Sequence, residues 1–233
     1  MYKRQIHLFS DGDSSDWVEH NRRFWKTMRA GKTGWLHIIH PDGHHRRIEA
    51  RYEKGLDEGF EMDPAFFGWA TYGVYLVAEQ PYWEGVETVG DTWSSPPPVY
   101  FFGGGTTPGN GPPFGVSDEK DVSTAVITNP GDVAAWPKWT YNGPATSASV
   151  GVNGKVVEIP IELEEGESIT LDLDPKEQTA IRENGDDVTI DLGTFDFAPI
   201  PPGEEVSLEI TLIGTGGGSI ELELTPLYEW GLS

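Results

Sequence analysis

The chain has 233 residues and a mass of 25.7 kDa, which is enough for one large domain or two small ones. It contains 29 glycines and 18 prolines, too many helix breakers for a long helical bundle or a coiled coil. Its net charge of −22 disfavours contact with a nucleic-acid backbone, and the absence of cysteine excludes disulfide scaffolds, thiolate zinc sites, cysteine nucleophiles and iron–sulfur ligation.

The first residues of the chain, 1–13, carry Lys3 and Arg4 but lack the apolar stretch that follows the basic residues of a secretion signal. No run in the sequence approaches the roughly 18 apolar residues of a membrane-spanning helix. We therefore expect a protein that is made in soluble form and either stays in the compartment where it is made or leaves it by lysis.

The first half of the chain predicts one helix and a small sheet. Residues 13–15 offer N-cap side chains, and Gly31 is a typical terminator for a helix that runs to about Arg29. The apolar face of this helix is formed by Trp17, Phe24 and Met28. Strands are expected at 35–40, 46–53 and 67–78, with a turn at 41–43 between the first two. This pattern indicates an α+β domain.

A segment dense in proline and glycine, residues 94–115, separates two parts of different charge. Residues 1–100 hold 11 basic and 15 acidic residues, whereas residues 101–233 hold 5 basic and 23 acidic residues. The aromatic residues of the segment argue against a free flexible linker, so we interpret it as an extended arm or an ordered connection. The predicted domains are therefore 1–115 and 116–233.

The second half shows the clearest structural signal, an alternation of apolar and acidic residues with period two. The alternating runs cover 157–163, 169–173, 188–192, 206–212 and 220–224. Turn-forming pairs such as Asn153-Gly154, Asn184-Gly185 and Pro202-Gly203 fall between them. Five or more short strands joined by tight turns predict an antiparallel β-sandwich over 116–233. The whole chain is thus expected to be mainly β with a small α+β part.

No catalytic, cofactor or metal site is predicted. The four histidines His37, His40, His44 and His45 lie beside two arginines, which disfavour a bound cation, and a solvated hairpin tip explains them better. Most carboxylates fall on outward positions of strands, so no pair is predicted to act in catalysis. The pair 172/174 lacks the loop pattern of a calcium site, and the pair 186/187 belongs to a turn. The G-x-S-x-G elbow of serine hydrolases and the P-loop lysine are both missing.

Three aromatic residues of the second half admit two readings. Trp136, Trp139 and Tyr141 could stack on a sugar ring, or they could pack at a domain or subunit interface. We favour the interface, and the sequence names no carbohydrate-binding residues.

Several stretches, taken in order, resemble one family. They are the hairpin 36–52, residues 69–85 with Ala78–Trp83 (AEQPYW), residues 126–150 with Asn129–Asp132 (NPGD) and Trp136-Pro137, residues 163–177, and 197–214 with Pro201–Glu204 (PPGE). Their order is similar to that of the distal tail proteins of long-tailed, non-contractile bacteriophages, also called siphovirus-type tail components or minor tail proteins.

The resemblance implies an N-terminal ring-forming domain and a C-terminal galectin-like β-sandwich, with residues 227–233 packing back on the first domain. It implies a structural role without catalysis: a hexameric ring that joins the tail tube to the tail-tip hub or baseplate. The expected partners are further copies of the chain, the tail-tube protein and hub proteins. Neither a membrane nor sequence-specific nucleic acid is expected as a partner, and genome DNA only passes through the ring. The expected location is the virion tail tip, after assembly in the host cytoplasm.

Two other classes of function remain open from the sequence. One is a receptor- or carbohydrate-binding tail protein whose sandwich meets the host surface. The other is an enzyme acting on cell-wall glycan, although the sequence indicates no pair of carboxylates as its catalytic residues. Within the favoured class, residues 1–93 are expected to supply the ring contacts, since their more balanced charge makes burial less costly.

Overall fold

The computed structural model describes residues 2–9, 14–55, 63–95, 120–121, 125–214 and 216–232. These residues form two compact units. The first unit consists of Met1–Glu84 together with Glu229–Ser233, and the second of Gly85–Tyr228. Each unit is described below by itself.

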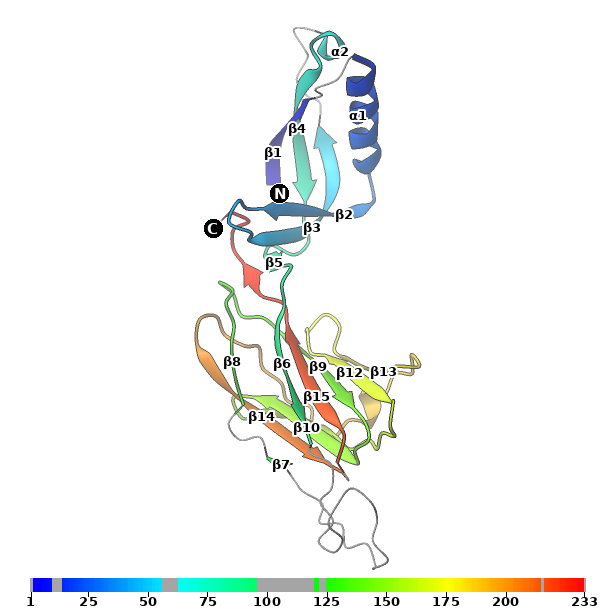
Figure 1. The fold of residues 1–233 in the computed structure, drawn as a ribbon, viewed down its shortest axis with the longest axis vertical. Coiled ribbons are helices and arrows are strands. Elements are labelled where there is room, and N and C mark those ends of the chain that lie inside the picture. Colours follow the sequence, from blue (N-terminus) through cyan, green and yellow to red (C-terminus); the bar gives the residue numbers. More distant parts are fainter. Residues whose placement is uncertain are drawn as a thin grey trace, which may run out of the picture. The chain divides into compact units, whose positions relative to one another are not determined.

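The first unit is a small antiparallel sheet with a helix packed on it (Figure 1). Strand β4 pairs with β1 on one side and with β3 on the other, and β2 pairs with β3. The elements in chain order are β1 (Tyr2–Phe9), α1 (Ser14–Thr27), β2 (Thr33–Ile39), β3 (His45–Gly55), α2 (Pro64–Phe67), β4 (Trp69–Val77) and the start of β5 (Trp83–Gly85). The predicted helix and the three predicted strands of this half are thus present, and β1 is a strand that the sequence pattern did not reveal.

Helix α1 is held on the sheet by its apolar face. Strand β4 buries every second residue, and Ala70, Tyr72, Val74 and Leu76 form a cluster with Trp17. The helix side of this cluster is completed by Phe24, Trp25 and Met28. The helical face predicted from the sequence is therefore confirmed.

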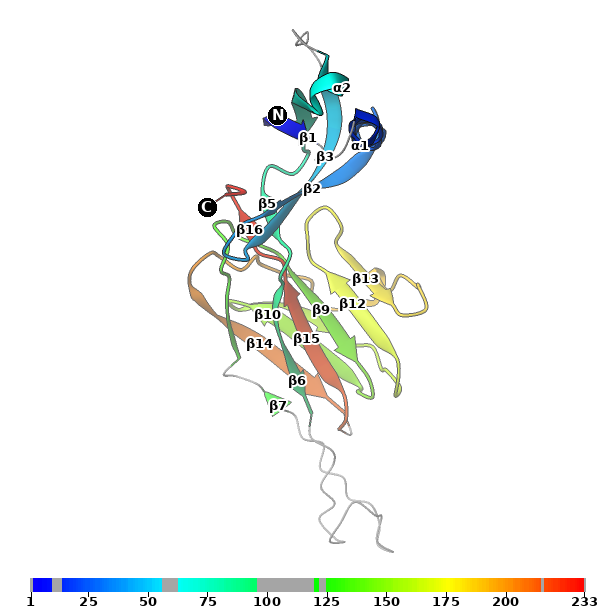
Figure 2. The same ribbon diagram turned by 45° about the horizontal axis from the view of Figure 1, so that its top comes forward.

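The second unit is a sandwich of two antiparallel sheets, which face each other in Figures 1 and 2. One sheet has the order β11-β10-β14-β7, with β8 also paired to β14, and the other has the order β13-β12-β9-β15-β6. The strands of the unit are β6 (Val89–Ser94), β7 (Lys120–Asp121), β8 (Val126–Thr128), β9 (Pro137–Asn142), β10 (Ser147–Val152), β11 (Lys155–Ile159), β12 (Ser168–Asp172), β13 (Thr179–Arg182), β14 (Glu205–Ile213), β15 (Ser219–Leu224) and β16 (Leu227–Tyr228). The prediction of a mainly β chain with an antiparallel sandwich is confirmed.

One predicted strand is wrong. Residues 188–192 form no strand but contain the short 3-10 helix η1 (Thr189–Asp191). Val188 is buried there and its N–H donates to the carbonyl of Ala180, whereas Ile190 is 93% exposed. The period-two pattern of this run therefore has another cause: one apolar residue anchors the loop and the next points into solvent.

The structure divides the chain at Glu84 rather than at residue 115. Strand β6 belongs to the sandwich because it pairs with β15 over its whole length, from Val89↔Leu224 to Ser94↔Ser219. Most of the proline- and glycine-rich segment 94–115 lies outside the described residues. Its described flanks, β6 and β7, both belong to the second unit, so the chain passes between the units at residues 84–85 and again at 228–229 instead.

Two of the sequence motifs meet around one buried amide. Asn129 is fully buried, and its Nδ2 donates to the carbonyls of Val133 and Ile200 at 2.9 and 3.0 Å. Its Oδ1 accepts from the N–H of Gly131 at 2.9 Å, and its own carbonyl accepts from the N–H of Gly203. Residues 129–132 and 201–204 therefore have a structural role. Their hydrogen bonds fix the turn that precedes Val133, and Val133 pairs with Leu227 of β16.

The last residues of the chain complete the first unit. The side chain of Arg46, which is buried, donates to the carbonyl of Trp230. A Cβ atom at Gly231 would lie 2.7 Å from Ile38 and 2.9 Å from the buried Trp83, so only glycine allows this close approach.

Replacing Asn129 by alanine is predicted to lower the free energy of unfolding of the second unit by about 2–4 kcal/mol, because it leaves several buried backbone groups without a partner. Urea denaturation followed by tryptophan fluorescence measures the change. Asn184→Ala, which removes an amide bonded to Asp186 at an exposed turn, is the control and should lose less than about 1 kcal/mol. Equal losses in both variants would contradict the role given to Asn129.

Candidate interaction surfaces

An exposed aromatic surface lies at α2 and the start of β4. The short helix is fixed at both ends: Asp63 Oδ1 accepts from the N–H of Ala65 at 3.0 Å, and Gly68, with φ 71°, donates to the carbonyl of Pro64 at 2.9 Å. We call its three exposed aromatic residues the aromatic patch: Phe66 (81% exposed), Phe67 (48%) and Trp69 (52%). A rigid turn that presents large aromatic side chains to solvent is typical of a protein–protein contact.

The outward face of the β2–β3 hairpin is a second candidate surface. The guanidinium of Arg47 lies 4.3 Å from the ring centre of Trp35, and its Nε is 3.1 Å from Glu84 Oε2. Trp35 remains 45% exposed and Ile39 71% exposed. The opposite face of the hairpin, by contrast, carries the buried Ile48.

The structure brings the hairpin histidines together in two groups. His37 Nδ1 and His45 Nε2 are 2.8 Å apart across the two strands. At the tip, Asp42 carboxylate oxygens lie 2.8 Å from His40 Nδ1 and 3.9 Å from His44 Nε2. The backbone N–H of His44, and then the side chain of His40, hold the pKa of Asp42 below its usual value. The sequence analysis missed the His37–His45 contact, which the strand register on either side of residues 41–43 could have revealed.

The other acidic pairs are engaged within the sandwich. Asp172 Oδ2 lies 2.9 Å from Lys138 Nζ, and its Oδ1 accepts from the N–H of Asp174. The bond from Asp172 raises the pKa of Lys138. Asp187 accepts from both the hydroxyl and the N–H of Thr189, which lowers its pKa. Within the described ranges, no group of three or more histidines and carboxylates is placed to hold a metal ion.

The three aromatic residues singled out as a sugar platform do not form one. Trp139 and Tyr141 are fully buried in the core of the sandwich, where Trp139 lies 6.2 Å from the ring of Trp93. Trp136 is half-buried and packs edge-on against Phe197 at 5.5 Å. The expectation that they lie at a domain or subunit interface is therefore corrected: alternation on β9 points Trp139 and Tyr141 inward, between the two sheets.

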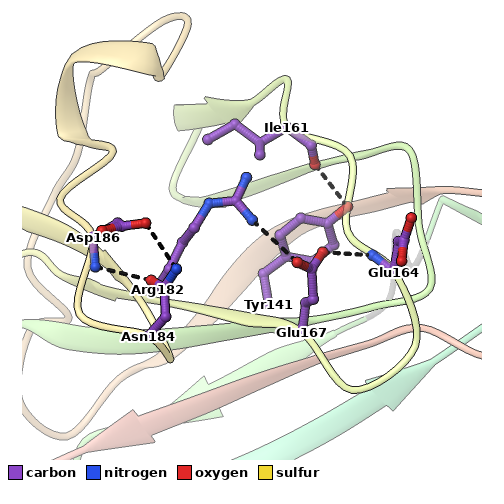
Figure 3. A network of polar contacts seen from close by, with 7 residues as sticks. All are labelled: Tyr141, Ile161, Glu164, Glu167, Arg182, Asn184 and Asp186. Atoms are coloured by element: carbon purple, nitrogen blue, oxygen red, sulfur yellow. Dashed lines mark hydrogen bonds and ion pairs between the residues drawn. The ribbon is translucent and has the colours of Figure 1, made fainter.

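A polar depression of about 350 Å³ opens on the sandwich between residues 166–168 and 182–184. Figure 3 shows Arg182 reaching toward Glu167, with 3.8 Å between Arg182 Nη1 and Glu167 Oε1. The other carboxylate oxygen of Glu167 accepts from the N–H of Glu164 at 2.8 Å. No aromatic residue lines the depression, so it lacks the flat apolar surface on which a sugar ring stacks.

Among the described residues, Tyr141 has the titratable side chain whose pKa is shifted most. Its hydroxyl donates to the carbonyl of Ile161 at 3.2 Å, as Figure 3 shows. Burial raises the pKa of Tyr141 far above its usual value, and the negative charge of Glu162 raises it further. The hydroxyl is therefore a fixed structural donor and not a proton-transfer group near neutral pH.

The likeness to known proteins is one of fold. Comparison of the sequence with family models and with curated proteins finds no match. Among solved structures, the chain shares its fold with adsorption-apparatus proteins of bacteriophages. One is the phage SPP1 Dit protein (gp 19.1), described as a paradigm of the hub adsorption apparatus in phages that infect Gram-positive bacteria; the TM-score is 0.59 at 14% identity, over 95% of this chain and 76% of that chain. Another is a chain of the phage P2 baseplate in its activated conformation with Ca, with a TM-score of 0.52 at 12% identity, over 99% of this chain and 80% of that chain.

These likenesses confirm the fold that the family resemblance implied. The SPP1 structure matches over nearly the whole chain, so the α+β unit and the sandwich are found together there as well. In the part of the chain that the structure describes, no helix is both long and apolar enough to cross a membrane.

Replacing Tyr141 by phenylalanine is predicted to change how stability depends on pH. In the unfolded chain the phenol ionises near pH 10, whereas in the folded chain it stays protonated well above that pH. The contribution of Tyr141 is therefore fully present below about pH 10 and falls by about 1.4 kcal/mol per pH unit above it. The difference in urea midpoint between the two proteins, measured from pH 8 to pH 11.5, should shrink or reverse at high pH. A constant difference would contradict this.

Proposed function

We propose that the chain is a structural protein of the tail tip of a long-tailed bacteriophage. In this role six copies form a ring that joins the tail tube to the tail-tip hub or baseplate and lets genome DNA pass. The observation that carries the proposal is the likeness to the SPP1 Dit protein over 95% of the chain. The partners are then further copies of the chain, the tail-tube protein and hub proteins, in a virion assembled in the host cytoplasm. No catalytic step is part of this role.

The distribution of exposed aromatic residues supports ring contacts through the first unit. Five of the six exposed Phe and Trp residues that the structure describes belong to this unit. They are Trp35, Phe66, Phe67, Trp69 and Trp230. Aromatic residues are enriched in the buried centres of protein interfaces, and each supplies a large apolar area.

The charge of the two units supports the same assignment. The first unit contains 11 basic and 14 acidic residues, and the second contains 5 basic and 24 acidic residues. Placing two surfaces of the second unit against each other would bring carboxylates together, which costs desolvation and repulsion. Contacts between first units avoid most of this cost.

The burial of Trp139 and Tyr141 supports the ring adaptor over the alternative function, a receptor- or carbohydrate-binding tail protein. The depression described above is lined by a glycine and by polar residues, two of which form an ion pair with each other. A glycan-binding role would need a surface other than these two.

The purified chain is predicted to form a closed particle of six copies, with a mass of about 154 kDa from subunits of 25.7 kDa. Gel filtration with light scattering over a concentration series measures this. A particle of another closed stoichiometry would contradict the hexamer, and a chain that never assembles, even with purified tail tubes present, would contradict the adaptor role.

The double variant Phe66→Ser/Trp69→Ser is predicted to lower ring formation strongly while changing the stability of the monomer by less than about 1 kcal/mol, because both side chains are exposed in the single chain. The matched control is Ile190→Ser, which removes an exposed apolar side chain from the second unit. Light scattering reports assembly and thermal unfolding reports stability. Normal ring formation by the double variant would exclude the aromatic patch from the interface.

A further inference from the structure

The outer face of α1 and the residues that follow it carry a cluster of positive charge. Five of the 16 basic residues of the chain fall within residues 22–32. We call them the basic face: Arg22, Arg23, Lys26, Arg29 and Lys32, all of them exposed. They contrast with a chain whose net charge is −22.

The packing of α1 directs this cluster to solvent. Trp17, Phe24 and Met28 hold the opposite face of the helix against the sheet of the first unit. Arg22 and Lys26 are four residues apart, so they stand one above the other on the exposed side. The pair cannot swing toward the sheet without displacing the apolar contacts.

Most charges of the basic face lack an acidic partner in the described chain. Arg23 pairs with Glu19 one turn earlier. Within the described ranges, no carboxylate oxygen lies within 4.0 Å of the side-chain nitrogens of Arg22, Lys26, Arg29 or Lys32. In the second unit, by contrast, Lys138, Lys155 and Arg182 each pair with a carboxylate of their own unit.

The helix dipole explains only part of the cluster. A positive charge in the last turn of a helix is stabilising, which accounts for Lys26. Arg22 lies a turn earlier and Lys32 lies five residues beyond the last helical residue, so the dipole accounts for neither of them. Two like charges at Arg22 and Lys26 also repel each other, so the arrangement is unfavourable for the helix alone.

The acidic surplus of the second unit supplies the complementary surface. That unit holds 24 acidic and 5 basic residues. On β15 the alternating Glu221 and Glu223 point to solvent while their neighbours Leu222 and Leu224 are buried. Glu223 lies opposite Lys138, which is already paired with Asp172, so the outer face of this sheet keeps a net negative charge.

We infer that the basic face of one copy receives the acidic sandwich of the next copy. Two chains of −22 repel each other in most orientations, and opposite charges attract where the basic face meets a second unit. The contact joins two different surfaces, so it is head-to-tail and can close a ring. The inference rests on the proposed ring and adds to it a salt-sensitive contact that selects the orientation in which copies approach.

The salt dependence of self-association tests this inference. Sedimentation velocity of the full chain at 50 mM and at 500 mM NaCl should show association at least about tenfold weaker at high salt, since the screening length falls from above 10 Å to a few ångströms. Arg22→Glu/Lys26→Glu should weaken association about tenfold or more at 50 mM NaCl and abolish the salt dependence. The milder Arg22→Gln/Lys26→Gln should fall between this variant and the natural chain, and circular dichroism checks that α1 is intact in each.

The control variant is Arg51→Glu/Lys54→Glu, which makes the same change in net charge on exposed residues of β3 in the same unit. It should associate much more tightly than Arg22→Glu/Lys26→Glu. The inference is overturned if association is equally strong or stronger at 500 mM NaCl. It is also overturned if the two charge-reversed variants lose the same amount of association.

The same experiment separates failure of this inference from failure of the proposed function. A hexamer that forms normally in Arg22→Glu/Lys26→Glu overturns the inference and leaves the ring adaptor in place. Salt-sensitive, α1-dependent association that never reaches a closed particle supports the contact and contradicts the hexameric ring. Complete absence of association under all conditions contradicts the contact.

Discussion

The cost of burying a carboxylate governs the second unit of this protein. Among the described residues no Asp or Glu is buried, although this unit holds 24 acidic residues. Side chains alternate along a strand, so a slip of one residue would carry Glu221 and Glu223 into the core and expel Leu222 and Leu224. The same constraint acts on β14, where Val206, Leu208, Ile210 and Leu212 are buried between polar neighbours. Acidity therefore fixes the register of the strands as well as the charge of the surface.

The sequence predicted the elements whose pattern is local. The helix with Trp17 and Phe24 on its inner face, the β2–β3 hairpin and the strands β12, β14 and β15 all follow from periods of 3.6 or 2 that can be read within a few residues. Strand β1 was not predicted, and the residues of β6 were assigned to the first domain instead of the sandwich. Each of these strands is defined by pairing with a strand that is distant in the sequence. At residues 188–192 the local pattern was misleading: Val188 anchors a loop and Ile190 faces solvent, which gives an alternation without a ladder of hydrogen bonds.

The candidate surfaces were harder to predict from the sequence, because the exposure of a side chain also depends on contacts that are distant in the sequence. Exposure of Phe66 and Trp69 depends on how the rigid turn of α2 is held by Asp63 and Gly68, and nothing in composition distinguishes these aromatics from Trp139, which is buried. Two of the motifs that carried the family resemblance proved to be structural. Asn129 joins residues 129–132 to residues 201–204 through buried hydrogen bonds, which explains how these motifs indicate a fold without indicating a reaction.

The path of the chain has a consequence for biosynthesis. The first unit begins at the N-terminus but includes Glu229–Ser233, and Trp83 lies against Gly231. Since a ribosome releases the N-terminus first, the sandwich is fully translated while the first unit still lacks its final residues. The hydrogen bond from Arg46 to the carbonyl of Trp230 likewise forms only after residues 85–228 have been made. A chain that terminates before Glu229 would therefore lack part of the first unit, the unit that carries the aromatic patch and the basic face.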